Sequence, residues 1–305
     1  MGLFSRLFGG QKPGPRPAFK KKRQRLPVAD VSRRFDLRGR TGQGSMSKVY
    51  HAYDNKLGRM VCLKVLDKVK TARFEERFSN QGLDKPSEGA ICMAIKHPNC
   101  VATYEHGITT KKEPYLVMEW IEGLGLNYLI ETKSPQLKGN RLNYLKQLCE
   151  AVEYMHGQKF LHRDLCPRNV MVTKEGQVKL IDFGLTIPYV PEFCRPGNRT
   201  GTADYLAPEI IRRTSTDHRV DVFALGVTAF ELFTSQLPWE RAMSSEETLR
   251  KHLNTPPRDP KDLNPDLGDD LCALLRKAIA RDPAQRTGSA TAFREALEHL
   301  DRDDY

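Results

Sequence analysis

The sequence has no long hydrophobic run and no paired cysteine pattern. Its longest apolar run, residues 222–230, is far shorter than the roughly 20 residues that span a bilayer. The seven cysteines are scattered, form no C-x-x-C pair and follow no secretory leader, which favours reduced thiols in a cytoplasmic protein. No internal repeat is visible. We therefore expect neither a transmembrane segment nor a disulfide scaffold.

Glycine and proline, at 22 and 19 of 305 residues, are too few for a collagen-like or disordered chain. The net charge of +11 is unusual, but it is local. Residues 1–40 hold 12 Lys and Arg against two Asp, whereas residues 41–305 hold 37 basic and 36 acidic side chains. Because the folded part is near neutral and carries no nucleic-acid motif, we expect no specific nucleic acid partner.

The first 33 residues are expected to form a basic, disordered tail, because they contain too little apolar area to fold alone. Two roles stay open for this tail. It is either a solubilising linker or a weak contact with an anionic membrane surface, through the basic residues at 20–25 and the leucines and phenylalanines of residues 3–8. Residues 301–305 form an acidic C-terminal tail.

The rest of the chain divides into two patterns. Residues 34–121 contain strand-like stretches punctuated by glycine, with one helix between Phe74 and Lys96. In residues 122–300 helical periodicity dominates, as where Leu142, Leu145 and Leu148 recur every three residues. The sequence thus predicts an α+β protein in which a β-rich lobe with one helix precedes a mainly α-helical lobe.

A glycine-rich turn joins the first two β-prone stretches at residues 39–49. Glycines there would let backbone amides approach phosphate oxygens. A dinucleotide fingerprint fits poorly because a strand follows where a helix should start, and a P-loop fails because Gly-Lys-Ser/Thr is absent. A plain hairpin stays open as the alternative. The candidate nucleotide-binding residues are Thr41, Gly42, Gln43, Gly44, Ser45, Met46, Ser47, Lys48 and Val49.

Lys64 stands in an otherwise apolar strand, Val-Cys-Leu-Lys-Val-Leu. An unpaired ammonium group is costly to bury, so this lysine should have an anionic partner. Glu88, in the expected helix, is the candidate. Both side chains could close on nucleotide phosphates.

Three motifs follow in order along the second lobe. They are His-Arg-Asp-Leu-Cys-Pro-Arg-Asn at residues 162–169, Asp-Phe-Gly at 182–184 and Ala-Pro-Glu at 207–209. Together with the glycine-rich turn and the Val-x-x-Lys strand, they resemble the eukaryotic-type serine/threonine protein kinases, as a single kinase domain over about residues 35–300. The resemblance implies a bilobal protein kinase fold that binds ATP and Mg²⁺ between its lobes. It also implies transfer of the γ-phosphate to Ser or Thr hydroxyls of protein substrates.

Residue chemistry supports the roles that the resemblance implies. Asp182 and Asn169 offer hard oxygen ligands for Mg²⁺. Asp164 is suited to accept or orient the proton of the substrate hydroxyl. With Lys64 and Arg168, Asp164 and Asn169 make up the expected catalytic set.

Further positions match the kinase pattern. The resemblance implies that Met118 is the gatekeeper and that the backbone of Glu119 and Ile121 grips adenine. It also implies that Thr202 bonds the catalytic aspartate and thereby favours Ser/Thr specificity. Finally, it implies two architectural contacts, in which Asp221 anchors the catalytic loop and Glu209 pairs with Arg286.

Three residues depart from the family pattern. Ser47 replaces the third loop glycine, and Gly125 falls where many kinases carry a polar side chain for the ribose. Cys166 stands where Ser/Thr kinases usually place a lysine for the γ-phosphate. Arg168 is the candidate to compensate, because a forked guanidinium can bind phosphate oxygens. The alternative is therefore a pseudokinase scaffold, which would bind nucleotide without turnover.

Overall fold

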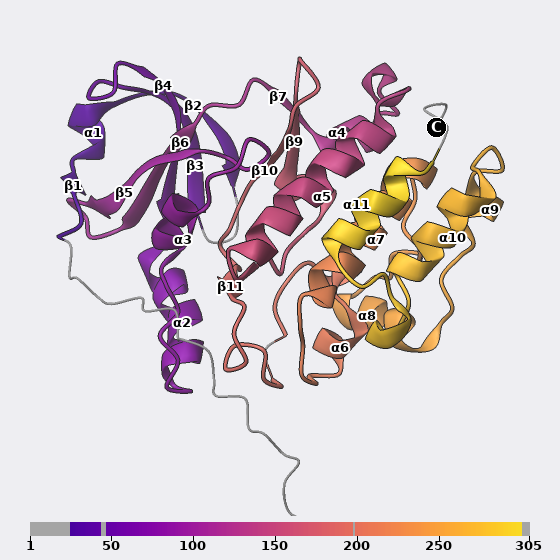
Figure 1. Ribbon diagram of the computed structural model, residues 1–305. Helices are drawn as coiled ribbons and strands as arrows, with labels where there is room; N and C mark the ends of the chain where they lie inside the picture. Colours follow the sequence, from indigo (N-terminus) through magenta and orange to yellow (C-terminus); the bar gives the residue numbers. More distant parts are fainter. Residues whose placement is uncertain (1–24, 44–46, 198, 301–305) are drawn as a thin grey trace, which may run out of the picture.

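The computed structural model describes residues 25–43, 47–197 and 199–300. A β-rich lobe is followed by a mainly helical lobe (Figure 1), which confirms the expected α+β fold class. Among the described residues, no helix is both long enough and apolar enough to cross a membrane.

The first lobe is a six-stranded sheet with the strand order β1-β5-β6-β4-β3-β2. Its strands are β1 (Val28–Ala29), β2 (Phe35–Gln43), β3 (Ser47–Asp54), β4 (Arg59–Leu66), β5 (Thr103–Thr109) and β6 (Pro114–Glu119). Neighbouring strands are antiparallel, except that β1 runs parallel to β5.

Strand β4 places different chemistry on the two faces of this sheet, because successive side chains alternate in direction. Val61, Leu63 and Val65 are buried in a small core that belongs to the first lobe alone. Cys62 and Lys64 share the opposite face, where Cys62 packs against the large core that continues into the second lobe. The only lysine of β4, Lys64, therefore lies on the face of the sheet that is directed toward the second lobe.

Two main helices, α2 (Lys68–Ser79) and α3 (Glu88–Ala94), replace the single helix expected between residues 74 and 96. The helical conformation is interrupted at residues 80–87, where Gly82 has a φ of +71°. Pro86 cannot donate a helical hydrogen bond, and Ser87 then caps the start of α3. The one-helix prediction is thus wrong because glycine and proline divide the segment.

Most of residues 25–33, the last part of the expected tail, is folded. β1 extends the sheet, and Asp30 caps the short helix α1 (Val31–Arg34). Ala29 is buried in the small core, and Arg34 pairs with Asp54 and Glu105 at the start of the sheet. These apolar and ionic contacts hold the segment, so the disordered-tail prediction is wrong for it. Residues 1–24 and 301–305 lie outside the described part.

The second lobe contains two small sheets and most of the helices. Its strands are β7 (Gly123–Gly125), β8 (Phe160–Leu161), β9 (Val170–Thr173), β10 (Val178–Leu180) and β11 (Ile187–Pro188). Its helices are α4 (Leu126–Glu131), α5 (Arg141–Gly157), α6 (Pro208–Ile211), α7 (Arg219–Thr234), α8 (Ser245–Asn254), α9 (Pro260–Leu263), α10 (Asp269–Ala278) and α11 (Ala290–Glu298). Short 3-10 turns are η1 (Pro135–Leu137), η2 (Pro167–Asn169), η3 (Ala203–Tyr205) and η4 (Pro283–Gln285).

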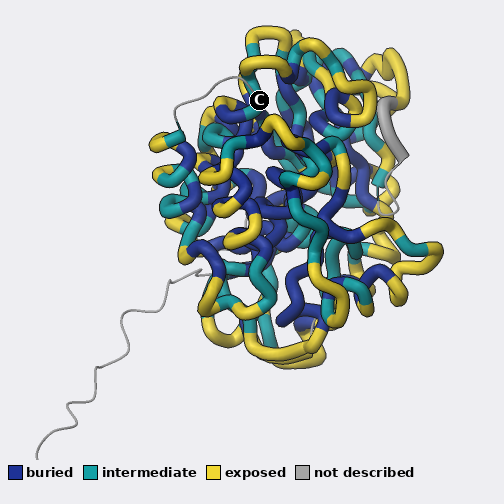
Figure 2. The backbone as a smooth tube through the Cα atoms, turned by 90° about the vertical axis from the view of Figure 1, so that its right-hand side faces the viewer, coloured by how far each residue is buried: buried dark blue, intermediate teal, exposed yellow. Residues whose placement is uncertain are grey.

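Helix α7 forms the centre of this lobe, and nearly every one of its residues is buried. Helix α5 packs against α11 and α7, and α10 packs against α7. Figure 2 shows the buried segments gathered inside a layer of exposed turns. This core supports the loops between β8 and β11, which carry the first two of the three motifs, at residues 162–169 and 182–184.

Candidate active site

Lys64 lies on β4 and makes two ion pairs across the interlobe face. Its Nζ donates to Glu88 Oε1 of α3 at 2.7 Å and to Asp182 Oδ1 at 2.9 Å. The lysine is only 6% exposed. The pairing of Lys64 with Glu88 that the apolar strand predicts is therefore present, and Asp182 joins it.

The electrostatic environment keeps this cluster ionised. Burial alone lowers the pKa of Lys64, but the carboxylates of Asp182 and Glu88 outweigh it and raise the pKa above its usual value. Burial likewise opposes ionisation of Asp182, while Lys64 more than offsets it and holds the pKa of that carboxyl below its usual range. The site thus carries a fixed positive charge beside an ionised carboxylate.

Asp164, between β8 and η2, is held on both carboxylate oxygens. Its Oδ1 accepts the backbone N–H and the hydroxyl of Thr202, each at 2.8 Å. Its Oδ2 accepts the Asn169 side-chain amide at 3.0 Å, and the same amide donates to the Asp164 carbonyl at 2.8 Å. Thr202 therefore contacts the aspartate as expected, and the carboxylate has a fixed orientation.

Two residues of this region adopt left-handed backbone conformations that side-chain-bearing residues rarely take. Arg163 has a φ of +73° and Asp182 a φ of +63°. Such residues persist where surrounding contacts overdetermine them, as they do at many functional sites. For Arg163 that contact is Asp221, whose Oδ1 accepts its backbone N–H at 2.9 Å.

Asp221, at the start of α7, supports the catalytic loop from inside the protein. It is 1% exposed and also accepts the His162 backbone N–H and bonds the His156 ring, both at 2.9 Å. Burial raises its pKa, but these donors outweigh burial and lower it. The anchoring contact implied for this residue is present.

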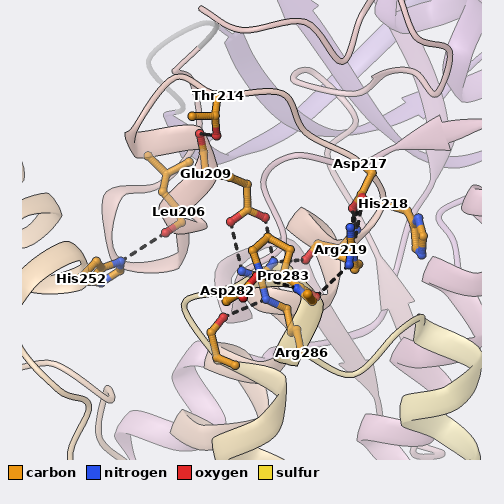
Figure 3. A network of polar contacts seen from close by, with 12 residues as sticks. Leu206, Glu209, Thr214, Asp217, His218, Arg219, His252, Asp282, Pro283 and Arg286 are labelled. Atoms are coloured by element: carbon orange, nitrogen blue, oxygen red, sulfur yellow. Dashed lines mark hydrogen bonds and ion pairs between the residues drawn. The ribbon is translucent and has the colours of Figure 1, made fainter.

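A second architectural contact, between Glu209 and Arg286, lies deeper in the helical lobe (Figure 3). The Arg286 guanidinium donates to both carboxylate oxygens of Glu209, at 2.7 and 3.0 Å, and to the Arg219 carbonyl at 2.7 Å. Both charged side chains are buried. The expected pair is therefore present and fixes the Ala-Pro-Glu motif on α6.

The candidate Mg²⁺ ligands fit a hard cation. Asp182 uses Oδ1 for Lys64 and for the Gly184 N–H at 3.0 Å, and its side chain is 47% exposed. Asn169 donates its amide nitrogen to Asp164, which leaves its amide oxygen as an acceptor. One carboxylate and one amide match Mg²⁺ sites completed by phosphates and water. The described residues contain no group of three or more His, Cys, Asp or Glu side chains that could hold a metal on their own.

The glycine-rich turn forms a hairpin between β2 and β3. Gly42 pairs with Val49, and Gln43 pairs with Lys48, in the antiparallel ladder; Thr41 precedes them in β2, and Ser47 begins β3. Gly44, Ser45 and Met46 lie outside the described residues. The Ser47 side chain lines the pocket described next.

One pocket brings together Lys64 and Asp164 of the expected catalytic set, whereas Asn169 and Arg168 are not among its lining residues. It is lined by Ser47, Lys64, Leu66, Thr71, Phe74, Glu75, Lys85, Glu88, Asp164, Asp182, Gly184 and Leu185. The sequence alone did not indicate Glu75 of α2 or Lys85 of the following loop. Burial raises the pKa of Glu75 and lowers that of Lys85. The Gly82 and Pro86 break separates Glu75 and Lys85 from α3 in the sequence, and only the fold brings them into one pocket.

The expected adenine-contacting residues lie at the end of β6 and directly after it. Met118 and Ile121 are buried, and Met118 pairs with Cys62 in the sheet. The Glu119 carboxylate accepts the Ala102 N–H at 2.8 Å and Lys179 Nζ at 2.9 Å. Within the described part of the chain, the N–H and C=O of Ile121 make no hydrogen bond and are available to a ligand.

Arg168 and Cys166 differ in accessibility. Arg168 is exposed on η2, and its side chain makes no hydrogen bond or ion pair with another described residue. The Cys166 side chain is buried, and burial, followed by the nearby Asp164 charge, raises the pKa of its thiol to about 12. The structure therefore does not join Arg168 to the pocket that contains Asp164.

Residues 35–300 match the family model of the protein kinase domain. The chain belongs to the protein kinase family. In protein kinases, a lysine–glutamate pair between the sheet and a helix, together with the aspartate of Asp-Phe-Gly, must be in place for phosphoryl transfer. Lys64, Glu88 and Asp182 occupy this arrangement.

Several curated bacterial proteins are similar to this chain. A probable serine/threonine-protein kinase of Streptomyces coelicolor is 32% identical over 273 residues, which cover 87% of this chain and 39% of that protein. Serine/threonine-protein kinase pkn3 of Myxococcus xanthus is 29% identical over 290 residues, 90% of this chain and 51% of the relative. PknB of Mycobacterium tuberculosis is 31% identical over 279 residues, 88% and 43% respectively. The chain thus spans about half or less of each relative.

Proposed function

We propose that this chain is an active protein serine/threonine kinase that transfers the γ-phosphoryl group of ATP to Ser or Thr hydroxyls of proteins. One observation carries the proposal. Lys64, Glu88, Asp164 and Asp182 line a single pocket, with the lysine–glutamate pair formed. Phosphoryl transfer depends mainly on positioning and charge stabilisation, and these side chains are suited to both.

Each residue has a distinct role in this proposal. Lys64 binds nucleotide phosphate, and Glu88 keeps its ammonium group in place. Asp164 accepts or orients the proton of the substrate hydroxyl, with its carboxylate held by Thr202 and Asn169. The fixed carboxylate removes the need to orient the catalytic group during the reaction.

Asp182 and Asn169 would hold Mg²⁺, which supplies positive charge to the phosphates when bound. The adenine would contact Met118 and the backbone of Glu119 and Ile121, while residues 41–49 would cover the phosphates. The Thr202–Asp164 hydrogen bonds and the names of the relatives support Ser/Thr specificity. The seven free cysteines support a cytoplasmic location.

The deciding experiment compares the wild-type chain with Asp164→Asn, using labelled ATP, Mg²⁺ and generic protein substrates. We expect the substitution to lower transfer by about a hundred- to ten-thousandfold, the range attributed to positioned acid–base groups. Asp270→Asn, on the exposed surface of α10, is the matched control and should leave the rate unchanged. Thermal unfolding checks that each variant is folded.

Wild-type protein that binds ATP yet transfers no more phosphate than Asp164→Asn would instead identify a nucleotide-binding scaffold. Lys64→Met adds an independent test of the phosphate contact. It should lower ATP affinity and transfer together, because Lys64 is proposed to bind phosphate before the reaction.

A further inference from the structure

A cleft lined by arginines lies beside the segment that leads to Thr202. Its lining consists of Arg77, Phe78, Gln81, Gly197, Arg199 and Arg213. No acidic side chain lines the cleft. None of the three arginine side chains makes a hydrogen bond or ion pair with another described residue. Like charges that share a cleft repel one another, so an anion bound between them would be stabilised.

Two of these arginines are carried by elements that other contacts fix in place. Arg77 lies on α2 beside Phe78, whose buried ring packs against Phe193 at a centroid distance of 5.6 Å. Arg213 follows α6 with a φ of +56°. The next residue, Thr214, donates its N–H and hydroxyl to the Glu209 carbonyl at 3.0 and 3.2 Å, and Figure 3 shows this turn above the Glu209–Arg286 pair.

The third arginine, Arg199, lies two residues before Gly201, which approaches the backbone of the catalytic loop closely. Gly201 has a φ of +133°, and a Cβ there would lie 2.9 Å from the Arg163 carbonyl oxygen. Only glycine fits this close approach without strain. Thr202 then bonds Asp164. Because three residues span at most about 11 Å, Arg199 lies within that distance of Thr202, measured between Cα atoms.

We propose that this arginine cleft binds a carboxylate or phosphate group of the protein substrate. The anionic residue would lie about three to five positions from the phosphorylated Ser or Thr, since an extended peptide advances about 3.3 Å per residue. Guanidinium groups bind both anions in a forked geometry. A phosphoserine carries more charge and more acceptor oxygens than a glutamate, so it is the stronger ligand. The inference rests on the proposed kinase function and specifies its substrate class.

The test measures kcat/KM for a set of peptides with a single acceptor serine. The parent peptide is neutral, and the others carry Glu or phosphoserine at each of the third to fifth positions on either side. We expect about a tenfold preference for the best Glu peptide and about a hundredfold preference for the best phosphoserine peptide, because each tenfold step corresponds to one modest charge-assisted contact.

Charge reversal identifies the residues responsible. Arg77→Glu and Arg213→Glu should each reduce the preference at least about fivefold, while activity on the neutral peptide stays unchanged. The double variant should favour peptides with Lys at the same position. Arg38→Glu is the matched control and should retain the wild-type preference. Arg38 lies on an exposed part of β2, and its side chain makes no ion pair or hydrogen bond among the described residues.

Direct binding keeps this proposal separate from catalysis. Fluorescence polarisation of a labelled phosphoserine peptide against the full chain should give tighter binding than its serine counterpart, and Arg213→Glu should abolish the difference. Equal binding and equal kcat/KM for neutral and anionic peptides would overturn the proposal. Absence of transfer with selective binding intact would count against the kinase function alone.

A threonine of this chain itself, once phosphorylated, would be the competing occupant. If phosphatase treatment lowers activity on the neutral peptide in the wild type but not in Arg213→Glu, the cleft binds an internal phosphate, and the substrate assignment is wrong. If the peptide preference persists in phosphatase-treated protein that mass spectrometry finds unmodified, the substrate assignment is supported.

Discussion

At the scale of single residues, Cys166 and Arg168 determine how much positive charge the catalytic loop can offer to a bound phosphate. The buried thiol, whose pKa is raised to about 12, is neutral at physiological pH and adds no positive charge. Arg168 is exposed and retains its full set of donors for a ligand. In the proposed kinase, Arg168 would have to reach the γ-phosphate when substrate and nucleotide are bound.

Arg168→Ala should therefore lower kcat more than it raises KM, by roughly ten- to a thousandfold, because the lost contact is made mainly in the transition state. Steady-state kinetics with ATP and a saturating peptide measure the split, and Arg168→Lys should retain part of the activity. An unchanged kcat in Arg168→Ala would mean that another cation stabilises the γ-phosphate in the transition state. Lys85, which lines the pocket with Asp164 and Asp182, would then be the next candidate.

The two partners of Lys64 differ in how well the local sequence pattern predicts them. A lysine in an apolar strand requires a counter-charge, and Glu88 supplies it. The second partner, Asp182, comes from 118 positions away, and nothing in the local pattern specifies that contact. Only the resemblance to kinases placed Asp182 in the same site before the structure did.

At the scale of elements, the Glu209–Arg286 pair joins α6 to the turn before α11. Arg286→Met should destabilise the protein by about 3–5 kcal/mol, because a buried carboxylate is left without its partner. The measurement is urea unfolding at neutral pH. The matched control is Arg276→Met, whose partner Asp259 is partly exposed, and it should change stability by less than about 1 kcal/mol. Equal losses in both variants would contradict the importance of burial here.

Helix α8 carries a histidine that makes stability depend on pH. His252 is 1% exposed, and its ring packs at a tilt against Trp239. Its Nδ1 bonds the Leu206 carbonyl at 3.2 Å (Figure 3). Burial lowers its pKa, and the carbonyl contact only partly opposes this. The folded state therefore binds this proton less readily than the unfolded state does.

Stability should accordingly fall as the pH drops below about 6.5, where an unfolded histidine gains its proton. Each such histidine contributes at most about 1.4 kcal/mol per pH unit. Comparing urea midpoints at pH 7.5 and 5.5, His252→Asn should show a smaller decrease than the wild type. His299→Asn, an exposed control, should show the full decrease. An identical pH dependence in all three proteins would exclude His252 as a source.

At the scale of the whole molecule, the charge is divided between a neutral folded part and a basic N-terminal segment. We propose that residues 1–24 contact anionic membrane surfaces. Full-length protein should co-sediment with anionic vesicles at low salt and be released at high salt, since each basic residue adds about 1 kcal/mol of screened attraction. A chain that begins at residue 25 should stay in solution with its kinase activity intact.

Equal sedimentation of the two proteins would leave this segment as a solubilising linker. Cutting at residue 25 is essential to the comparison, because the next residues belong to the fold. Removal of β1 and α1 would take away Ala29 from the small core and Arg34 from its pairs with Asp54 and Glu105. Any lost activity would then report unfolding and not membrane contact.

Much of the architecture was predictable from the chain alone. The change from strand-like to helical periodicity indicated the two lobes, and the buried character of α7 followed from its composition. The folded state of residues 25–33 was not predictable, because two strand residues and one helical turn carry almost no periodic signal. The arginine cleft was hidden for another reason. Arg77, Arg199 and Arg213 belong to three separate elements that only the tertiary fold brings together.

The alternating direction of the side chains along β4 also determines which cysteine a reagent bound in the adenine position can reach. Cys62 shares the face of Lys64 and pairs with Met118, which places one sulfur beside the expected adenine position. The other six cysteines are buried, and burial raises the pKa of Cys62 to about 11. Ordinary alkylating reagents therefore react slowly throughout the chain. A reagent carried on an adenine mimic would be brought close to Cys62, so this thiol is an attachment point for covalent inhibitors.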